Sequence, residues 1–172
     1  EIKPDYIAAC FDLPKPTFRH TTYEAYKSGR KQAEDALIEQ IKESYKLCES
    51  LSIPTYTCEG FEADDLLGTF AEQIKNNKEY RVVIASGDMD TLQLVDKERV
   101  TVFTLKKGNE GVFYTEKEVN ERFGFGPEHI PDYKGLAGDP SDNIIGISGI
   151  GDKTATDLIK KYGSIEGMYK VL

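Results

Sequence analysis

Four groups of acidic residues stand beside predicted strand ends or tight turns of this sequence. They comprise eight carboxylates: Asp12, then Glu62, Asp64 and Asp65, then Asp88 and Asp90, then Asp139 and Asp142. Clustered carboxylates repel one another, and this repulsion raises their pKa values unless a cation lies between them. Hard divalent ions such as Mg²⁺ or Mn²⁺ prefer oxygen ligands, and two of them can activate water and stabilise the leaving oxygen in phosphodiester cleavage. We therefore interpret these residues as the ligands of two metal ions.

Each of these acids also has a simpler structural explanation. An isolated aspartate at a strand end is more often a helix N-cap than a metal ligand, and Glu62 or Asp64 fits the first turn of a helix. Asp139 fits an ordinary turn. The recurrence of acids at all four places favours the metal site over these separate explanations.

The stretch Asp88-Met89-Asp90-Thr91 indicates a rival chemistry. It matches the Asp-x-Asp-x-Thr pattern of haloacid-dehalogenase-type phosphotransferases, in which the first aspartate is a nucleophile. That motif usually follows an apolar strand directly, whereas residues 85–87 intervene here. The rival also leaves the other carboxylates unexplained, so we favour the metal site.

The elements that must position these acids alternate between strands and helices. The apolar pattern predicts strands over 5–12, 53–58, 81–86, 100–105 and 112–114, helices over 34–51, 63–76, 90–95 and 115–123, and a turn over 107–111. Residues 13–33 have no clear apolar period and are predicted to form a long loop or irregular helix. The alternation predicts an α/β domain with a mostly parallel sheet, whose carboxyl strand ends carry Asp12, Glu62 and Asp88.

Two further segments suit nucleic acid. The first mixes cations with rings: Arg19, His20, Tyr23, Tyr26, Lys27 and Arg30. The second resembles a helix–hairpin–helix turn, in which closely spaced glycines let amides approach phosphate before a helix N-terminus: Gly146, Ser148, Gly149, Gly151, Lys153 and Thr154. The alternatives are a solvated surface loop for the first and a plain turn between packed helices for the second.

Charge and composition bound the possible partners. The net charge of −8 argues against a nucleic-acid partner unless the excess acid is concentrated in a metal site, where bound cations invert the local potential. Cys10 and Cys48 are interpreted as small core residues in a reducing compartment, so we expect a cytoplasmic protein. No apolar run approaches the roughly 20 residues that span a bilayer, and we expect no membrane partner.

Taken together, four stretches resemble the 5′-nuclease family, which includes the 5′–3′ exonuclease domain of bacterial DNA polymerase I and the flap endonucleases. They are FDLPKPTFRHTTYEAYKSGR, GFEADDLLG, ASGDMDTLQLV and LAGDPSDNIIGISGIGDKTATDLIKKYGS, and the similarity runs from near residue 5 to near residue 165. The resemblance implies a PIN-like α/β catalytic core over 1–126, with a mostly parallel sheet. It also implies a helix–hairpin–helix (helix–two-turn–helix) DNA-binding subdomain over 127–172.

By the same resemblance, the eight acids hold the two Mg²⁺ or Mn²⁺ ions. Arg19, Lys27 and Arg30 lie in a helical arch that the 5′ strand passes through, with His20 and Tyr23 contacting the DNA. Lys27 and Arg30 are the catalytic cations, which steer the scissile phosphate and offset developing charge. Residues 146–155 grip the downstream duplex and bind K⁺ through turn carbonyls.

We therefore expect a metal-dependent 5′–3′ exonuclease or flap endonuclease that hydrolyses 5′-flap or nicked duplex DNA in primer removal and repair. The implied partners are DNA with a flap, nick or 5′ end and a polymerase domain fused in the same protein, and the chain is expected to be a monomer. The alternative is a non-catalytic, structure-specific DNA-binding module of the same fold. Because the family begins with a strand carrying an early metal-binding aspartate, this chain is expected to start at the second strand and to be weakly active or inactive by itself.

Overall fold

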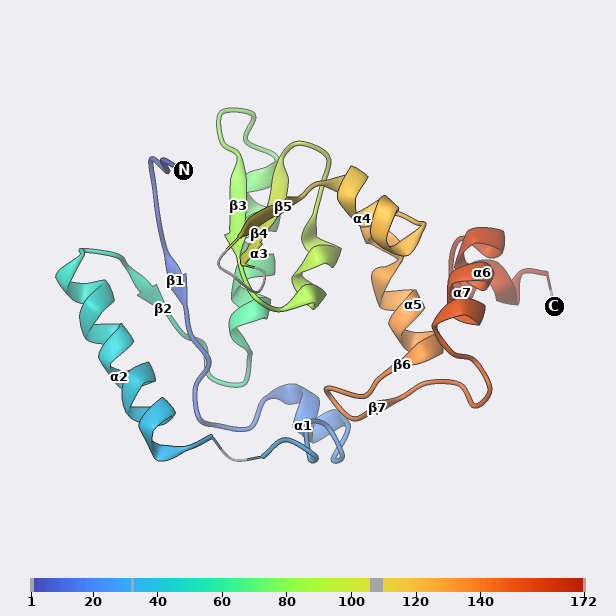
Figure 1. Cartoon of the computed structure of the whole chain (residues 1–172), viewed down its shortest axis with the longest axis horizontal. Coiled ribbons are helices and arrows are strands. Elements are labelled where there is room, and N and C mark those ends of the chain that lie inside the picture. The colour runs from blue at the N-terminus through green and yellow to red at the C-terminus, as the bar shows by residue number, and fades with distance from the viewer. Residues whose placement is uncertain (1, 32, 106–109, 172) are drawn as a thin grey trace. The chain divides into compact units, whose positions relative to one another are not determined.

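The computed structural model describes residues 2–31, 33–105 and 110–171 of the chain. Helices and short strands alternate along this part of the sequence, as Figure 1 shows. The chain forms two compact units, which meet in the sequence between Leu67 and Gly68. The turn predicted over 107–111 falls mostly outside the described residues.

The first unit is built on a short parallel pair of strands. β1 (Ala9–Cys10) pairs with β2 (Thr55–Tyr56), and α1 (Phe18–Thr22) and α2 (Asp35–Ser50) lie between them in the sequence. The prediction of a strand over the whole of 5–12 is wrong. Ile7 is 55% exposed, so the apolar residues before β1 are not buried and do not stabilise a longer strand.

The helix α2 follows the predicted amphipathic pattern and agrees with the predicted range of 34–51 to within a residue at each end. Tyr45 of this helix stacks on Phe11 beside β1, with ring centroids 4.1 Å apart. Offset stacking of this kind adds roughly 1 kcal/mol to the burial of the rings and fixes α2 beside the strand pair. None of the described helices combines the length and the apolar character needed to cross a membrane.

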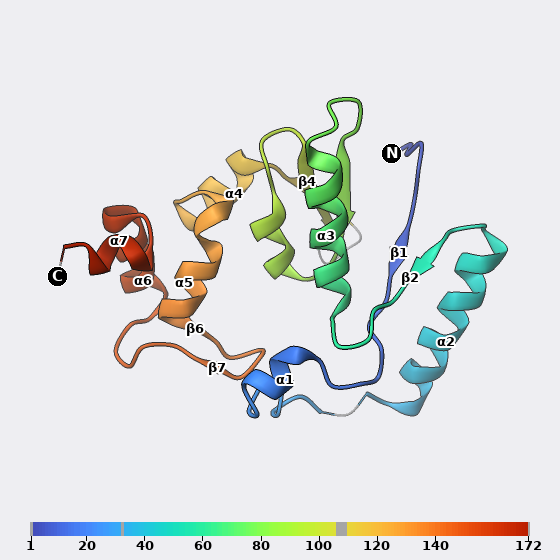
Figure 2. The ribbon, with the colours of Figure 1, turned by 180° about the vertical axis from the view of Figure 1, so that it is seen from behind.

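The helix α3 (Ala63–Lys75) begins in the first unit and continues in the second, and Figure 2 shows its full length. The predicted helix over 63–76 is therefore confirmed. Asp64 and Asp65 lie in its first turn and Lys75 in its last, an order that complements the helix dipole. On its inner side Gly68 leaves room for Leu94, because an added Cβ would come within 3.3 Å of that side chain.

The second unit contains a three-stranded sheet in the order β3 (Val82–Ala85), β4 (Val100–Leu105) and β5 (Gly111–Tyr114). β3 and β4 are parallel, and β5 returns antiparallel to β4 as the predicted hairpin. Alternate residues point to one buried face: Ile84, Val100, Val102 and Tyr114, which are at most 7% exposed. The short 3-10 helix η1 (Met89–Leu94) follows β3, close to the predicted helix over 90–95.

A capping box begins α4 (Glu116–Phe123), as the sequence predicts. The Thr115 hydroxyl accepts a hydrogen bond from the Lys117 amide at 3.2 Å, and Glu118 accepts one from the Thr115 amide at 2.9 Å. At the other end Gly124 adopts a left-handed conformation, with φ of 80°, and ends the helix.

The remaining elements are η2 (Pro127–His129), α5 (Ile130–Ala137), β6 (Gly138–Asp139), β7 (Ile144–Ile145), α6 (Asp152–Tyr162) and α7 (Ile165–Tyr169). The antiparallel pair β6–β7 is not among the predicted elements. It depends on a close approach of two glycines, because a Cβ on Gly138 would lie 2.5 Å from the Gly146 nitrogen, and a Cβ on Gly146 would lie 2.4 Å from the Gly138 nitrogen.

Candidate metal centre and nucleic-acid-binding residues

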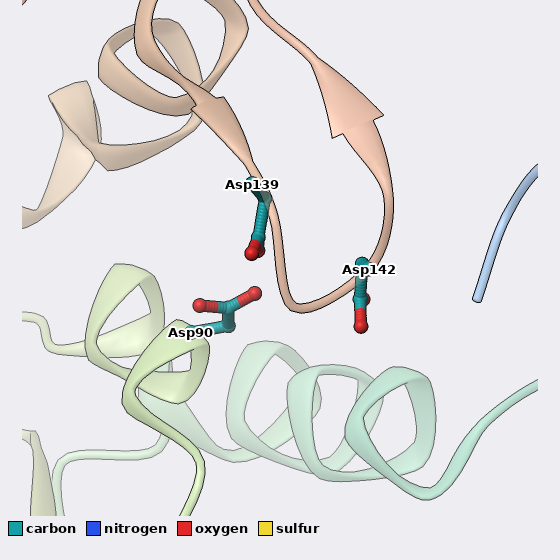
Figure 3. Close-up of side chains that lie close together, drawn as sticks. All are labelled: Asp90, Asp139 and Asp142. Atoms are coloured by element: carbon teal, nitrogen blue, oxygen red, sulfur yellow. The ribbon is translucent and has the colours of Figure 1, made fainter. Parts of the chain in front are cut away.

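Three of the predicted ligands gather in the second unit. Asp90 lies in the first turn of η1, Asp139 ends β6, and Asp142 follows in the turn before β7. Each offers a carboxylate oxygen, and the three oxygens lie within 4.8 Å of one another. Figure 3 shows the Asp90 carboxylate directed toward Asp139, with Asp142 on the far side of the β6–β7 turn.

The β6–β7 turn holds two of these carboxylates in a fixed relation. One oxygen of Asp139 accepts hydrogen bonds from the amide and the hydroxyl of Ser141, at 3.0 and 2.6 Å. The amide of Asp142 in turn donates to the backbone carbonyl of Asp139 at 3.2 Å. Asn143 completes the turn with a φ of 58°, a left-handed conformation that asparagine tolerates better than most residues.

Lys134 of α5 contacts two of these three carboxylates. Its ammonium donates to Asp139 Oδ2 at 2.7 Å and also to Asp90 Oδ1. This lysine is not among the site residues predicted from the sequence. A signal was present, since Lys134 lies five residues before Asp139 and directly before the Gly135-Leu136-Ala137-Gly138 segment that leads into it.

Burial and Lys134 affect the two carboxylates differently. Burial opposes the ionisation of Asp139, yet its hydrogen bonds from Lys134 and Ser141 together hold its pKa at about 2. For Asp90 burial outweighs the hydrogen bond from Lys134, and its pKa is raised. The pKa of Lys134 is itself raised, because the two carboxylates together outweigh its own burial. Asp139 is thus the more firmly ionised member of the pair.

The donor chemistry of this cluster fits a hard divalent cation. All three candidate ligands are carboxylates, which suit Mg²⁺ or Mn²⁺, and no thiol or imidazole belongs to the group. The ammonium of Lys134 forms ion pairs with both Asp90 and Asp139. This pair of carboxylates therefore already binds a positive group.

Asp88 lies just beyond the carboxyl end of β3, as the sequence predicts. It is the N-cap of η1, where its Oδ1 accepts a hydrogen bond from the Asp90 amide at 2.9 Å. Its own amide donates to the Ser86 hydroxyl at 3.0 Å. Among the described residues it does not belong to the group of three close carboxylates. The capping contact orients Asp90, and a metal-binding role for Asp88 stays a prediction.

The acids of the first unit are paired with the basic segment, which is the stretch of cations and rings from Arg19 to Arg30. Asp65 receives two hydrogen bonds from Arg19, both at 2.7 Å, and these contacts lower the pKa of Asp65. Glu62 receives the ammonium of Lys27 at 2.7 Å and the hydroxyl of Tyr26 at 3.0 Å. The same residues that were predicted to bind metal and DNA therefore form one ionic network within this unit.

Two other predicted ligands lie near the start of α3. Asp12 Oδ1 accepts a hydrogen bond from the Ala63 amide at 2.6 Å, so this carboxylate caps the helix. Asp64 is half-buried in the first turn. Burial, followed by the nearby Asp64 carboxylate, raises the pKa of the Cys10 thiol.

The basic segment is held by Tyr26, which is 5% exposed. Lys27 beside it has a φ of 56°, which is uncommon for a residue with a side chain and directs its ammonium to Glu62. His20 is occupied locally, since its Nδ1 lies 3.1 Å from both the amide and the hydroxyl of Thr17. Tyr23 and Arg30 are exposed.

The predicted helix–hairpin–helix turn lies between β7 and α6. Gly149 adopts a φ of 83°. Gly151 is the N-cap of α6 and, as a glycine, has no side chain with which to cap the helix. Ser148, Lys153 and Thr154 are exposed. The amino end of α6 thus carries Gly151, Asp152 and Lys153 in order. Its glycine and lysine suit a phosphate, and Asp152 opposes one.

Comparison with known proteins identifies relatives of the whole chain. Residues 1–124 match the 5′-3′ exonuclease N-terminal resolvase-like domain, and residues 125–172 match the 5′-3′ exonuclease C-terminal SAM fold. The chain is 42% identical to DNA polymerase I of Caldicellulosiruptor bescii over 99% of its length and 41% identical to that of Bacillus caldotenax over 98%. It spans about a fifth of the length of these relatives, 20% and 19% respectively.

Solved structures of nucleases have the same fold. The 5′-exonuclease of bacteriophage T5 with bound zinc matches with a TM-score of 0.81 and 27% identity, over 98% of this chain and 64% of the other. A complex of the T5 flap endonuclease with DNA and metal ions matches with a TM-score of 0.81, 26% identity and the same coverage of 98% and 64%. The catalytic core of Rad2 with DNA, at 19% identity and a TM-score of 0.55, shares the fold over 94% of this chain and 49% of the other. These matches confirm the predicted combination of an α/β core with a C-terminal helical element.

Proposed function

The chain belongs to the 5′-3′ exonuclease family, and from this membership we propose that it hydrolyses phosphodiester bonds in 5′-flap or nicked duplex DNA with the help of divalent metal ions. The observation that carries the proposal is the close group of Asp90, Asp139 and Asp142. Relatives described as metal-bound exonucleases and as a flap endonuclease with DNA support it.

In this proposal the carboxylates hold two Mg²⁺ or Mn²⁺ ions, with Asp90, Asp139 and Asp142 in the second unit and Asp12, Glu62, Asp64, Asp65 and Asp88 as the other candidate ligands. Such ions, when bound, supply an activated water and neutralise charge at the phosphate. The protein fixes the oxygens in advance: Ser141 holds one oxygen of Asp139, and the Asp88 cap holds the backbone of Asp90. Ligands held in this way lose little conformational freedom when a cation binds.

The basic segment supplies the positive charge that the substrate needs. We propose that Lys27 and Arg30 face the scissile phosphate, with Arg19, His20 and Tyr23 contacting the 5′ strand. Lys27 also has a left-handed backbone, a conformation that costs about 1–3 kcal/mol and that clusters at functional sites. In this structure its ammonium pairs with Glu62.

The helix–hairpin–helix turn between β7 and α6 is proposed to hold the duplex. Gly146 keeps β7 against β6, and the amides near Gly149 and Gly151 together with Lys153 and Thr154 would meet a backbone phosphate. Ser148 and a K⁺ ion at the turn carbonyls complete this proposed grip. We also propose that the domain acts as a monomer in the cytoplasm and next to a fused polymerase domain, as in the relatives described as DNA polymerase I.

The test is metal-dependent cleavage by the 172-residue chain. A 5′-labelled flap DNA is incubated with Mn²⁺, and we compare the chain with Asp139→Asn and with Asp35→Asn, an exposed residue of α2. Because the chain by itself is expected to cut weakly at most, we expect a low Mn²⁺-dependent rate that the first variant reduces to background and the second leaves unchanged. Cleavage without a divalent ion, or equal cleavage by Asp139→Asn, would contradict the proposal. Substitution of Asp88→Asn is expected to abolish cutting while DNA binding is retained.

A further inference from the structure

The side chain of Lys134 occupies the space between two candidate metal ligands. Its ammonium lies 2.7 Å from Asp139 Oδ2 and contacts Asp90 Oδ1 as well. The Asp139 side chain is only 8% exposed and that of Lys134 30% exposed, so water screens this contact incompletely. Lys134 belongs neither to the eight predicted ligands nor to the proposed DNA-binding residues.

A divalent ion held by Asp90 and Asp139 needs the same oxygen lone pairs that Lys134 now uses. The ammonium and the metal ion also repel each other, because both are positive and would share one pair of carboxylates. A lysine is suited to leave such a site, since its charge is compact and strongly hydrated and its four-carbon stem is flexible. An arginine would form a more rigid, two-point contact.

We propose that Lys134 is an exchangeable internal counter-ion of the metal centre. It keeps Asp90 and Asp139 together while no divalent ion is bound, and it yields both carboxylates when one binds. The inference rests on the proposed function, since it takes these aspartates as metal ligands. It adds that metal binding is an exchange of cations, so that Lys134 lowers the affinity for the ion while stabilising the metal-free site.

The test measures Mn²⁺ binding by electron paramagnetic resonance for the full chain, without DNA or turnover. Lys134→Met keeps much of the stem and removes the charge, and Lys117→Met is the matched control, because Lys117 is 76% exposed on α4. We expect Lys134→Met to bind Mn²⁺ at least about tenfold more tightly, which corresponds to about 1.4 kcal/mol. The control should bind as the parent does. The gain should vanish when Asp139→Asn is added.

The same exchange predicts a change in thermal stability. Without divalent ions Lys134→Met should unfold at a lower temperature than the parent, and Mn²⁺ should raise that temperature more in the variant. If the variant does not fold without metal, Mn²⁺ should restore its folded circular dichroism, and Lys134→Gln, which keeps hydrogen-bond donors, should behave in the same way. Failure of Mn²⁺ to restore either variant would overturn the proposal.

The outcomes separate this inference from the proposed function. Equal or weaker Mn²⁺ binding by Lys134→Met, with normal binding by the parent, refutes the exchange and leaves the metal centre intact. Absence of Mn²⁺ binding in the parent and both variants refutes the metal centre itself, and with it the exchange.

Discussion

The pH dependence of stability provides a quantitative test of the contacts around Asp139. Burial opposes its ionisation, but Lys134 and Ser141 lower its pKa from 3.8 to about 2. The change Asp139→Asn removes the charge while keeping the size of the side chain. The measurement is made with a chelator present, so that only the metal-free protein contributes.

The size of the effect follows from the two pKa values. A lowering from 3.8 to about 2 corresponds to about 2 kcal/mol of unfolding free energy at neutral pH. Because the folded-state pKa is the lower one, this stabilisation is present above the unfolded pKa and is lost as the pH falls from about 4 to about 2. Roughly half of it, about 1 kcal/mol, should be lost by about pH 3.

Urea unfolding of the parent and of Asp139→Asn near neutral pH and near pH 3 checks this reasoning. We expect the variant to be less stable by about 2 kcal/mol near neutral pH, and the difference to shrink to about 1 kcal/mol near pH 3. Asp35→Asn, on the exposed surface of α2, serves as the control for the loss of one charge. A difference that stays constant over this range would refute the account of Asp139.

Three further changes test other parts of the structure. Gly146→Ala should cost at least about 2 kcal/mol of unfolding free energy, because its Cβ would lie 2.3 Å from the carbonyl carbon of Ala137, the residue before β6. Gly151→Ala, where an added Cβ meets open space, is the control, and equal urea midpoints would contradict this. Arg19→Lys cannot make the two-point contact, so an NMR titration should show the pKa of Asp65 rising toward its ordinary value, and an unchanged pKa would count against the contact. Thr115→Ala should lower stability by about 1 kcal/mol in thermal unfolding, through loss of the capping box, and a neutral change would argue against that cap.

Much of the fold could be predicted because the local pattern agrees with the tertiary structure. α2 and α3 have a regular apolar stripe, and α4 has a capping box, so their bounds agree closely with the predicted ranges. The sheet over β3, β4 and β5 follows from its apolar runs. The strand expected over 5–12 failed, since an apolar run shows the residues available for burial but does not show whether a partner covers them.

The β6–β7 hairpin could not be predicted from periodicity, because two-residue strands are too short to show a period. The information lay instead in Gly138 and Gly146, whose backbones approach each other too closely for a Cβ. The spacing of such glycines becomes informative only when the pairing of the segments is known.

The candidate site was predicted in part. The sequence indicated the acids that gather in the second unit, Asp90, Asp139 and Asp142. It did not indicate Lys134, because a lone lysine near a helix end is usually solvated and its contacts depend on tertiary structure. The metal-binding roles of all eight acids, the DNA contacts and the domain division at residue 126 stay predictions.

The β6–β7 hairpin also has a consequence for the geometry of cutting. Three residues separate Asp142 from Gly146, and two of them form β7. On the proposed function, this short segment would therefore join a carboxylate that holds a metal ion to the turn that holds the duplex. On the same proposal, the length of this segment would set the distance between the held phosphate and the cut phosphate. A nuclease with a different cutting distance would thus need a hairpin of different length, and not only a different turn.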